Sequence, residues 1–399
     1  MKQGWEIKKL GDVANVSSGN SAPQKKELFE HGTFPFIRTS DVGKIKKGFI
    51  NSCVDYLNED GIKGLKLFRK GTILFPKSGA STFLNHRVMM EIDSYVSSHL
   101  ATIKAINSIA DDRYLLYFLS TIDARDLMQD IAYPSLKISD INLIKIPLPS
   151  LQEQQHIVSI LDEAFSAIAK AKANAEQNLK NAKELFESYL QGVFENKGEG
   201  WEEKKLIEIT TKIGSGATPR GGNESYKTEG ISLIRSMNVH DFEFRERNLA
   251  FIDDIQAKAL NNVMLQEDDV LLNITGASVA RCCIIPKDYL PARVNQHVSI
   301  IRAKKEIIDP NFLNLLLTSK FYKDQLLFTG EQGATRQAIT KAQLEVFRIT
   351  FPKSIKQQQD IVQQIDALSA ETKKLEAIYQ QKINDLEELK KSVLQKAFA

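Results

Sequence analysis

The sequence predicts an α+β protein: two duplicated mixed α/β lobes joined by two long antiparallel helices, which pair as an intramolecular coiled coil. Two observations lead to this prediction. The second half of the 399-residue chain repeats the first at an offset of about 200 residues. Each half also ends in an amphipathic stretch of about 45 residues with a heptad pattern. A duplication of this kind favours a pseudo-twofold relation between the copies.

The repeat divides the chain into four segments. We expect a first lobe over residues 1–149, a first long helix over 150–196, a second lobe over 197–352 and a second long helix over 353–399. The polar stretch 195–200, ENKGEG, has the composition of a linker between the first helix and the second lobe.

Short motifs carry the repeat along both lobes in the same order, which indicates a duplicated domain pair and not a solenoid. The paired motifs are GWE and KKL within 4–10 and 200–206, FPFIRTSDV at 34–42 and ISLIRSMNV at 231–239, GTILFPKSGAS at 71–81 and DDVLLNITGAS at 268–278, and SSHLATIKA at 97–105 and NQHVSIIRA at 295–303.

The first long helix has a clear predicted start. Pro147 and Pro149 block helix propagation from upstream. Ser150 and Glu153 have the spacing of a capping box, in which each side chain accepts from the backbone amide of the other residue. Apolar residues then recur at steps of three and four, which predicts a coiled-coil seam. The predicted seam residues of this helix are Ile157, Leu161, Ile168 and Leu185.

The second long helix repeats this design and is the predicted partner of the first. Its seam residues are Ile361, Ile365, Leu368, Leu375, Leu386 and Leu389. Antiparallel pairing would bring Asn178 and Lys382 together as a polar layer near the midpoint. The alternative is that each helix packs only on its own lobe.

Within the lobes, short alternating stretches predict strands, and longer apolar stretches predict helices. We expect strands at 36–38, 72–75 and 100–103, helices at 114–121 and 311–321, and closing strands at 144–149 and 347–352.

Composition limits the class of protein. The net charge is +3, and no run of about 18 apolar residues exists, so no transmembrane helix is expected. The N-terminal residues lack the apolar core of a signal peptide. The cysteines Cys53, Cys282 and Cys283 are few and lack C-x-x-C spacing. We therefore expect a cytoplasmic protein without structural zinc.

The sequence contains no recognisable catalytic motif. It lacks a P-loop, a GxSxG nucleophile, an HExxH zinc motif and the Asn/Asp-Pro-Pro-aromatic motif of amino-methyltransferases. We predict no metal site. Of the six histidines, only His99 and His297 fall at equivalent repeat positions. Their pairing fits either a functional hydrogen-bond donor or a half-buried structural histidine.

Taken together, these features resemble the specificity (S) subunits of type I restriction-modification enzymes. The motifs that carry the resemblance are the Trp-Glu-x-x-Lys-Leu opening of each lobe, Ile-Arg-[TS]-x-[DN]-Val, and PLPSLQEQQHIV running into the first long helix. The resemblance covers the whole chain. The second half departs mildly, because Thr350 to Pro352 replaces Pro-Leu-Pro and Gln357 replaces Glu153.

The resemblance implies a DNA-recognition role. In such proteins each lobe is a target recognition domain that reads one half of a bipartite, asymmetric site in double-stranded DNA. The helices set the spacing and dock two methyltransferase subunits, which methylate adenine at N6, and ATP-dependent restriction subunits join the complex. S-adenosylmethionine, ATP and Mg would therefore be bound by partner subunits, and this chain would itself be non-catalytic.

Base readout needs polar donors and acceptors on loops, and such residues gather at matching places in the two lobes. A plain turn is the alternative explanation for many of them, and the repeated arginines could instead form structural ion pairs. The candidates of the first lobe are Arg38, Thr39, Ser40, Lys77, Ser78, Ser81, Ser98, His99, Tyr133, Ser135 and Lys137. Those of the second lobe are Arg235, Ser236, Asn238, Asn273, Thr275, Ser278, Asn295, Gln296, Arg336 and Gln337.

Phosphate contacts are expected from a lysine-rich stretch of the first lobe and should make DNA binding salt-dependent. The small net charge indicates that partner subunits supply much of the affinity. The predicted phosphate contacts are Lys44, Lys46 and Lys47, within a cluster that also contains Lys63, Lys66, Arg69, Lys70 and Lys77.

Two other classes of function remain open at this stage. A two-lobed adaptor would bind proteins through its lobes and would have no effect on DNA specificity. A self-sufficient nucleic-acid enzyme would need a catalytic site, and the missing motifs argue against it.

Overall fold

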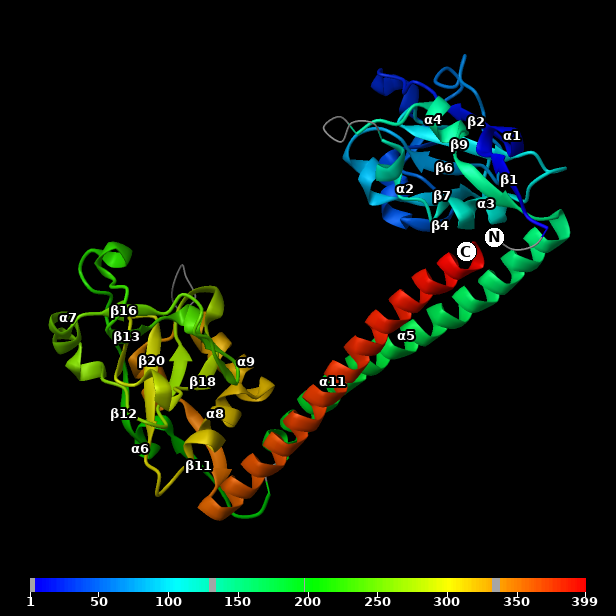
Figure 1. Cartoon of the computed structure of the whole chain (residues 1–399). Coiled ribbons are helices and arrows are strands. Elements are labelled where there is room, and N and C mark those ends of the chain that lie inside the picture. The colour runs from blue at the N-terminus through cyan, green and yellow to red at the C-terminus, as the bar shows by residue number, and fades with distance from the viewer. Residues whose placement is uncertain (1–3, 129–133, 197, 332–337) are drawn as a thin grey trace. The chain divides into compact units, whose positions relative to one another are not determined.

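The computed structural model describes residues 4–128, 134–196, 198–331 and 338–399. The chain divides into two compact units, residues 1–176 with 381–399 and residues 177–380. Each unit contains one lobe and parts of both long helices (Figure 1). The division cuts both helices, and the four-segment division of the sequence stays a prediction.

The first lobe is built on a five-stranded sheet in the order β2-β9-β6-β7-β4, with a smaller sheet β5-β3-β8 beside it. Strands β1 and β10 pair where the lobe begins and ends. Its elements are β1 (Glu6–Lys9), α1 (Leu10–Val13), β2 (Ala14–Ser18), η1 (Lys26–Phe29), β3 (Phe34–Ile37), α2 (Thr39–Ile45), β4 (Lys47–Ile50), β5 (Asp55–Leu57), β6 (Ile73–Pro76), η2 (Ala80–Leu84), β7 (Arg87–Met90), β8 (Tyr95–Val96), β9 (Leu100–Ala105), α3 (Asp112–Leu119), η3 (Ala124–Leu127), α4 (Ile138–Asn142) and β10 (Lys145–Leu148).

The second lobe repeats this topology. Its sheet β12-β20-β17-β18 corresponds to β2-β9-β6-β7, and β16-β13-β19 corresponds to β5-β3-β8. Its elements are β11 (Trp201–Lys205), α6 (Leu206–Ile209), β12 (Thr210–Ser215), η4 (Gly222–Ser225), β13 (Ile231–Ile234), η5 (Ser236–Asn238), β14 (Val239–His240), β15 (Glu243–Phe244), β16 (Ala250–Ile252), α7 (Asp254–Ala259), η6 (Asn261–Val263), β17 (Val270–Asn273), η7 (Gly276–Ser278), β18 (Cys282–Ile284), η8 (Lys287–Tyr289), β19 (Ala292–Val294), β20 (Val298–Ala303), α8 (Pro310–Thr318), α9 (Lys320–Glu331), α10 (Lys341–Val346) and β21 (Arg348–Pro352).

Three local predictions need correction. Strand β3 ends at Ile37, because Asp41 accepts the amide of Arg38 and starts helix α2 there. The helix expected over 311–321 is two helices, because Ser319 is extended and separates α8 from α9. In the predicted capping box, the amide of Glu153 donates to Ser150 as expected. The carboxylate of Glu153, which was expected to accept the amide of Ser150, accepts the indole N–H of Trp5 at 3.0 Å.

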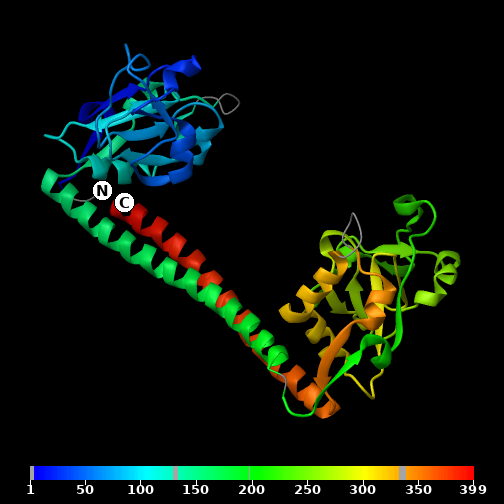
Figure 2. The ribbon, with the colours of Figure 1, turned by 180° about the vertical axis from the view of Figure 1, so that it is seen from behind.

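The long helices are α5 (Leu151–Glu195) and α11 (Ile355–Ala397). In the first unit Lys172 Nζ lies 2.5 Å from Glu387 Oε1. In the second unit Lys183 Nζ lies 3.8 Å from Glu376 Oε2. In the first unit Lys390 also lies over the ring of Phe165, and in the second Tyr189 also bonds Gln364. Within each unit, rising residue numbers of α5 therefore meet falling numbers of α11, so the helices are antiparallel, as Figure 2 also shows. No helix in the described part of the chain is both long and apolar enough to cross a bilayer.

Three predicted seam positions are wrong. Leu185, Leu375 and Leu389 are 59%, 40% and 48% exposed. A straight helix drifts away from a strict seven-residue repeat, so an extrapolated heptad leaves the packed face after a few turns. Phe186, Leu190, Thr372 and Ile383 take the inward positions instead. Of the other predicted seam residues, Leu161, Ile168 and Ile365 are buried, and Ile157, Ile361, Leu368 and Leu386 are half-buried.

The predicted polar layer is also absent from the helix pair. Asn178 and Lys382 are both exposed. Ala175 and Ala182 are buried on α5, and Thr372 and Ile383 are buried on α11. Small side chains therefore fill this part of α5.

A buried glutamine anchors each long helix to a lobe. Gln154 is fully buried, accepts the amide of Asp111, and donates to the carbonyls of Ile109 and Pro149. Gln358 does the same on α11 with Asp309, Ile307 and Pro352. The sequence contains both glutamines at matching positions, but the pattern alone did not distinguish them from their exposed neighbours.

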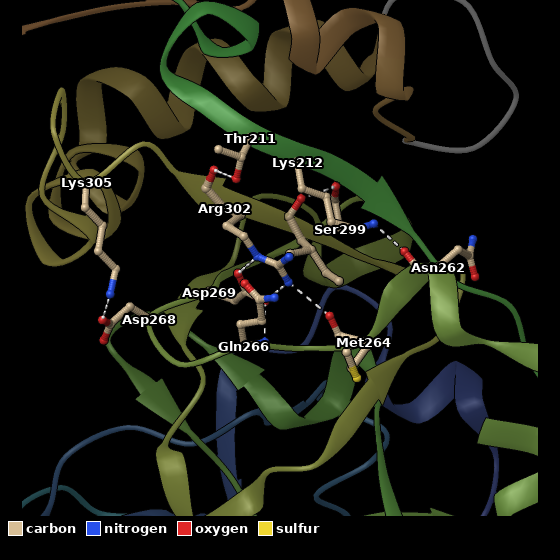
Figure 3. Close-up of polar contacts among 11 residues, drawn as sticks. Thr211, Lys212, Asn262, Met264, Gln266, Asp268, Asp269, Ser299, Arg302 and Lys305 are labelled. Carbon is tan, nitrogen blue, oxygen red and sulfur yellow. Dashed lines mark hydrogen bonds and ion pairs between the residues drawn. The ribbon is translucent and has the colours of Figure 1, made fainter. Parts of the chain in front are cut away.

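A buried ion pair ties two strands of the second lobe together (Figure 3). Asp269 is fully buried, and both its oxygens accept from the guanidinium of Arg302, at 2.7 and 2.8 Å. Asp269 also accepts the amide of Gln266 at 2.7 Å. The adjacent Asp268 pairs with Lys305 at 2.6 Å, where both side chains are largely open to solvent. Two neighbouring aspartates thus have very different surroundings.

Candidate nucleic-acid interface

Three loops of the second lobe surround a hollow of about 420 Å³. One loop follows β13, one follows β17, and one joins β19 to β20. The hollow is lined by Ser236, Met237, Thr275, Gly276, Ala277, Ser278, Arg281 and His297. Three predicted readout residues, Ser236, Thr275 and Ser278, therefore meet at one place.

A hydrogen-bonded chain runs along the rim of this hollow. Thr275 Oγ1 lies 2.5 Å from His297 Nδ1, and Gln296 Nε2 lies 3.1 Å from His297 Nε2. An amide nitrogen can only donate, so Nε2 of His297 accepts and Nδ1 carries the proton that is donated to Thr275. Thr218 donates to the other end of the Gln296 amide. This arrangement keeps Gln296, which is exposed, in a fixed orientation at the surface.

Arg281 is a positively charged residue that lines the hollow, and it is not among the readout residues predicted from the sequence. Its NH1 lies 3.5 Å from His240 Nδ1. In the described part of the chain, Arg281 forms no ion pair with a carboxylate, whereas nearby Arg245 is paired with Glu243 at 2.7 Å. Partial burial, followed by the charges of Arg245 and Arg281, lowers the pKa of His240. The imidazole beside Arg281 is therefore neutral at pH 7.

Three predicted readout asparagines face inward. Asn238 is buried, caps the amide of Arg235 and donates to the carbonyl of Arg245. Asn273 is buried and donates to the carbonyl of Ser236 at 2.8 Å. Asn295 is buried and accepts the amide of His297 at 3.0 Å. These side chains shape the loops from below, and the structure does not present them to a base.

The repeated arginines also have structural partners. Arg38 pairs with Asp55 and stacks against Phe29 and Phe36. Arg235 donates to a backbone carbonyl and lies over the ring of Tyr226. Arg38 therefore forms the ion pair that the structural alternative expected, whereas Arg235 is held by a carbonyl and an aromatic ring and, among the described residues, forms no ion pair.

The first lobe places its candidates on the corresponding loops. Lys77 donates its amide to the carbonyl of His99 at 3.0 Å, and Ser78 forms a bridge with Ser135. Ser81 donates to the carbonyl of Ser78, as a turn residue does. His99 is exposed, which differs from the half-buried His297. In the second lobe Thr275 forms the matching bridge with Ala338.

The remaining candidates are more dispersed. Thr39 and Ser40 open α2, Ser98 is half-buried beside β9, and Lys137 precedes α4. Tyr133, Arg336 and Gln337 lie outside the described residues.

The predicted phosphate contacts belong to a wider basic surface, which we call the Lys46 cluster: Lys44, Lys46, Lys47, His86, Lys390 and Lys391. Lys44, Lys46 and Lys47 are exposed. Crowding by protein atoms, then the charges of Arg87, Lys390 and Lys391, lower the pKa of Lys47. Lys390 and Lys391 come from α11, which sequence reasoning could not place beside residue 47.

Two other basic residues of the predicted stretch form ion pairs, as does Lys391 of the Lys46 cluster, which pairs with Glu388 at 2.6 Å. Lys63 pairs with Asp60 and Arg69 with Asp93. Arg87, beside the cluster, is fully buried, and its guanidinium stacks on Phe75. Burial lowers the pKa of Arg87 to about 9.

Among the described residues, no group of three or more His, Cys, Asp or Glu side chains is arranged to hold a metal ion. Burial raises the pKa of Cys53 to about 11 and that of Cys283 to about 12, so both thiols are protonated at neutral pH.

The structure defines a duplicated protein of two mixed α/β lobes and two long antiparallel helices, and comparison with known proteins identifies its family. Residues 2–180 and 198–388 each match the type I restriction modification DNA specificity domain. The chain therefore belongs to this family, whose curated relatives are named type I restriction enzyme specificity subunits.

Several relatives match over different lengths. The MjaIX specificity subunit of Methanocaldococcus jannaschii is 34% identical over 173 residues, which are 40% of this chain and 38% of the relative. The EcoBI specificity subunit of Escherichia coli is 25% identical over 99% of this chain and 85% of its own length.

Solved structures share the fold. A chain from work on the "complex assembly and conformational transition of the type I R-M system" has a TM-score of 0.76 at 20% identity, covering 100% of this chain and 98% of that one. The HsdS subunit from Thermoanaerobacter tengcongensis has a TM-score of 0.66 at 20% identity, covering 99% and 97%.

Proposed function

We propose that this chain is the sequence-specific DNA-binding subunit of a type I restriction-modification complex, and that each lobe reads one half of a bipartite, asymmetric site. One observation carries the proposal. Equivalent loops on the two lobes have the same backbone pairing but different side chains, Lys77 and Ser78 in one and Ile274 and Thr275 in the other. One scaffold with two donor sets is what an asymmetric two-part site requires.

The Lys46 cluster supports contact with the DNA backbone. Its members come from the end of α2 and the start of β4, from the residue before β7, and from the last turns of α11. Lysine ammonium groups neutralise phosphates and release counterions, so binding should weaken steeply with salt. The net charge of +3 is small, and we infer that partner subunits supply much of the affinity. Tight nonspecific DNA binding by the isolated chain at physiological salt would contradict this inference.

The long helices set the spacing between the half-sites in this proposal and dock two methyltransferase subunits. The exposed Leu185 and Leu389 support docking, because they occupy equivalent positions of the repeated helices and are 59% and 48% exposed. Large apolar side chains left in solvent at matching positions are suited to two copies of one partner.

The chemistry would belong to the partners. Methyltransferase subunits would bind S-adenosylmethionine and methylate adenine at N6, and restriction subunits would use ATP and Mg. This chain would be non-catalytic and would choose where the cytoplasmic complex acts.

A lobe exchange tests the proposal against a protein-binding adaptor. The chain is expressed with its methyltransferase subunits, and its second lobe, residues 197–352, is replaced by that of a relative with a different methylated motif. We expect one half of the methylated sequence to change while the other half and the spacer stay the same. An adaptor would leave the whole motif unchanged.

A further inference from the structure

Among the described residues that line the hollow of the second lobe, Arg281 is the one arginine or lysine, and its donors are largely uncommitted. Arg281 is half-buried at the end of the loop after β17. Its NH1 lies 3.5 Å from His240 Nδ1. Because that imidazole is neutral, it can accept from NH1 without repelling the guanidinium. One edge of the guanidinium, formed by Nε and NH2, is then left with two parallel donors.

The surroundings of Arg281 suit a base and not a phosphate. Phosphate sites gather several cations, as the Lys46 cluster does. Among the described residues, the lining of the hollow instead holds one guanidinium with uncharged side chains such as Ser236, Thr275 and Ser278 around it, and Thr275 is bonded to His297. A fork of two donors matches the O6 and N7 acceptors that guanine presents in the major groove.

The first lobe has a different side chain at this position. Val88 of β7 is paired with Leu74 of β6, and Cys283 of β18 is paired with Leu271 of β17. Leu74 and Leu271 occupy the same position of the repeated motifs 71–81 and 268–278, so Val88 corresponds to Cys283. His86 and Arg281 each lie two residues earlier and therefore correspond to each other. The two lobes therefore offer different donors at one place of a common scaffold.

Resting on the proposed function, we propose that Arg281 is the specificity-determining residue of the second lobe and reads a guanine in its half-site, with His240 as the residue that positions it. Arg281 thus joins the readout residues predicted from the sequence for this lobe, and guanine is the base that it reads.

The test uses the full chain in complex with its methyltransferase subunits and DNA duplexes in which each base pair of the methylated motif is replaced in turn. For Arg281→Ala we expect discrimination at one G·C pair of the second half-site to fall by roughly ten- to a hundredfold. The first half-site should be unaffected. His240→Ala should relax the same position to a smaller degree. Arg348→Ala, which removes a solvent-exposed ion pair with Glu203, is the matched control and should leave the motif unchanged.

Arg281→Lys separates base from phosphate contact and guards against a folding defect. A lysine keeps the charge, so a phosphate contact would survive, whereas the two-donor fork would be lost. We expect Arg281→Lys to relax the same G·C pair. The assignment is overturned if discrimination is unchanged at every position, or if Arg281→Ala weakens all sequences equally and lowers the salt slope by about one. A wild-type complex without any two-part motif would instead remove the proposed function itself.

Discussion

Removing the buried glutamine at the start of either long helix should loosen the helix from its lobe. Gln154 makes three hydrogen bonds to backbone groups, at 2.9, 3.1 and 2.9 Å, and is fully buried. Gln154→Ala leaves one amide and two carbonyls without these partners. At about 1 kcal/mol for each net hydrogen bond, the loss is about 3 kcal/mol, and more where the exposed groups stay dry.

Hydrogen exchange at single amides is the direct assay. In Gln154→Ala the amide of Asp111 loses its acceptor, and its exchange should accelerate by about a hundredfold, the factor that corresponds to about 3 kcal/mol. Gln358→Ala should accelerate the amide of Asp309 by a similar factor, because Gln358 makes the same three bonds. Each variant should leave the other amide unchanged.

The neighbouring Gln155 provides the matched control, because it has the same side chain on the same helix and is exposed. Gln155→Ala should change stability by less than about 0.5 kcal/mol. The reasoning is refuted if Gln154→Ala and Gln155→Ala behave alike, or if exchange at Asp111 does not change.

Further outcomes follow from the surroundings of particular residues. Asp269→Ala leaves the Arg302 guanidinium uncompensated and should lower the free energy of unfolding of the second lobe by about 3 kcal/mol. Lys305→Ala, which removes the solvent-exposed pair with Asp268, should cost less than about 1 kcal/mol; equal effects in urea unfolding would contradict the structure. Leu185→Lys and Leu389→Lys should each impair assembly with a methyltransferase subunit while the thermal stability of the chain is retained. If size-exclusion chromatography shows full assembly of the variants, these leucines are not part of the docking surface. The pKa of His240 is lowered in the folded chain, so below the ordinary histidine pKa of about 6.5 the folded chain binds fewer protons than the unfolded chain. The contribution of neutral His240 to stability is therefore present above that pH and is lost as the pH falls. A proton NMR titration that gives an imidazole pKa at or above 6.5 would disprove this.

The duplication of the chain could be predicted because short sequence motifs recur in the same order in both halves. Paired motifs gave the order of the lobes, and the proline pair before Ser150 gave the start of the first helix. The helix seam was predicted less well. Leu185, Leu375 and Leu389 fit a strict heptad, but the inward face of a real helix drifts. Phe186, which packs against the core of the second lobe, and the buried Ile383 take inward positions instead.

The candidate interface could be predicted only in outline. Polar residues after strands pointed to the right loops, and Ser236, Thr275 and Ser278 do converge on one hollow. The direction of each side chain could not be read from the sequence. Asn273 follows a strand just as a readout residue would, yet it turns inward to bond the backbone of Ser236.

Contacts between distant segments were also out of reach of sequence patterns. Arg281 stands between two apolar stretches and belongs to no motif. Only the pairing of β17 with β18 and the nearby β14 bring it beside His240. The Lys46 cluster likewise needs α11 to lie against the first lobe before Lys390 and Lys391 can join Lys47.

A genome-wide map of N6-methyladenine in the host, made with and without the gene for this chain, would test its role in DNA specificity. We expect deletion to abolish one two-part motif and a copy of the gene to restore it. A map that is unchanged by deletion, in cells where the chain and its methyltransferase partners are both present, would contradict the role of the chain in DNA specificity.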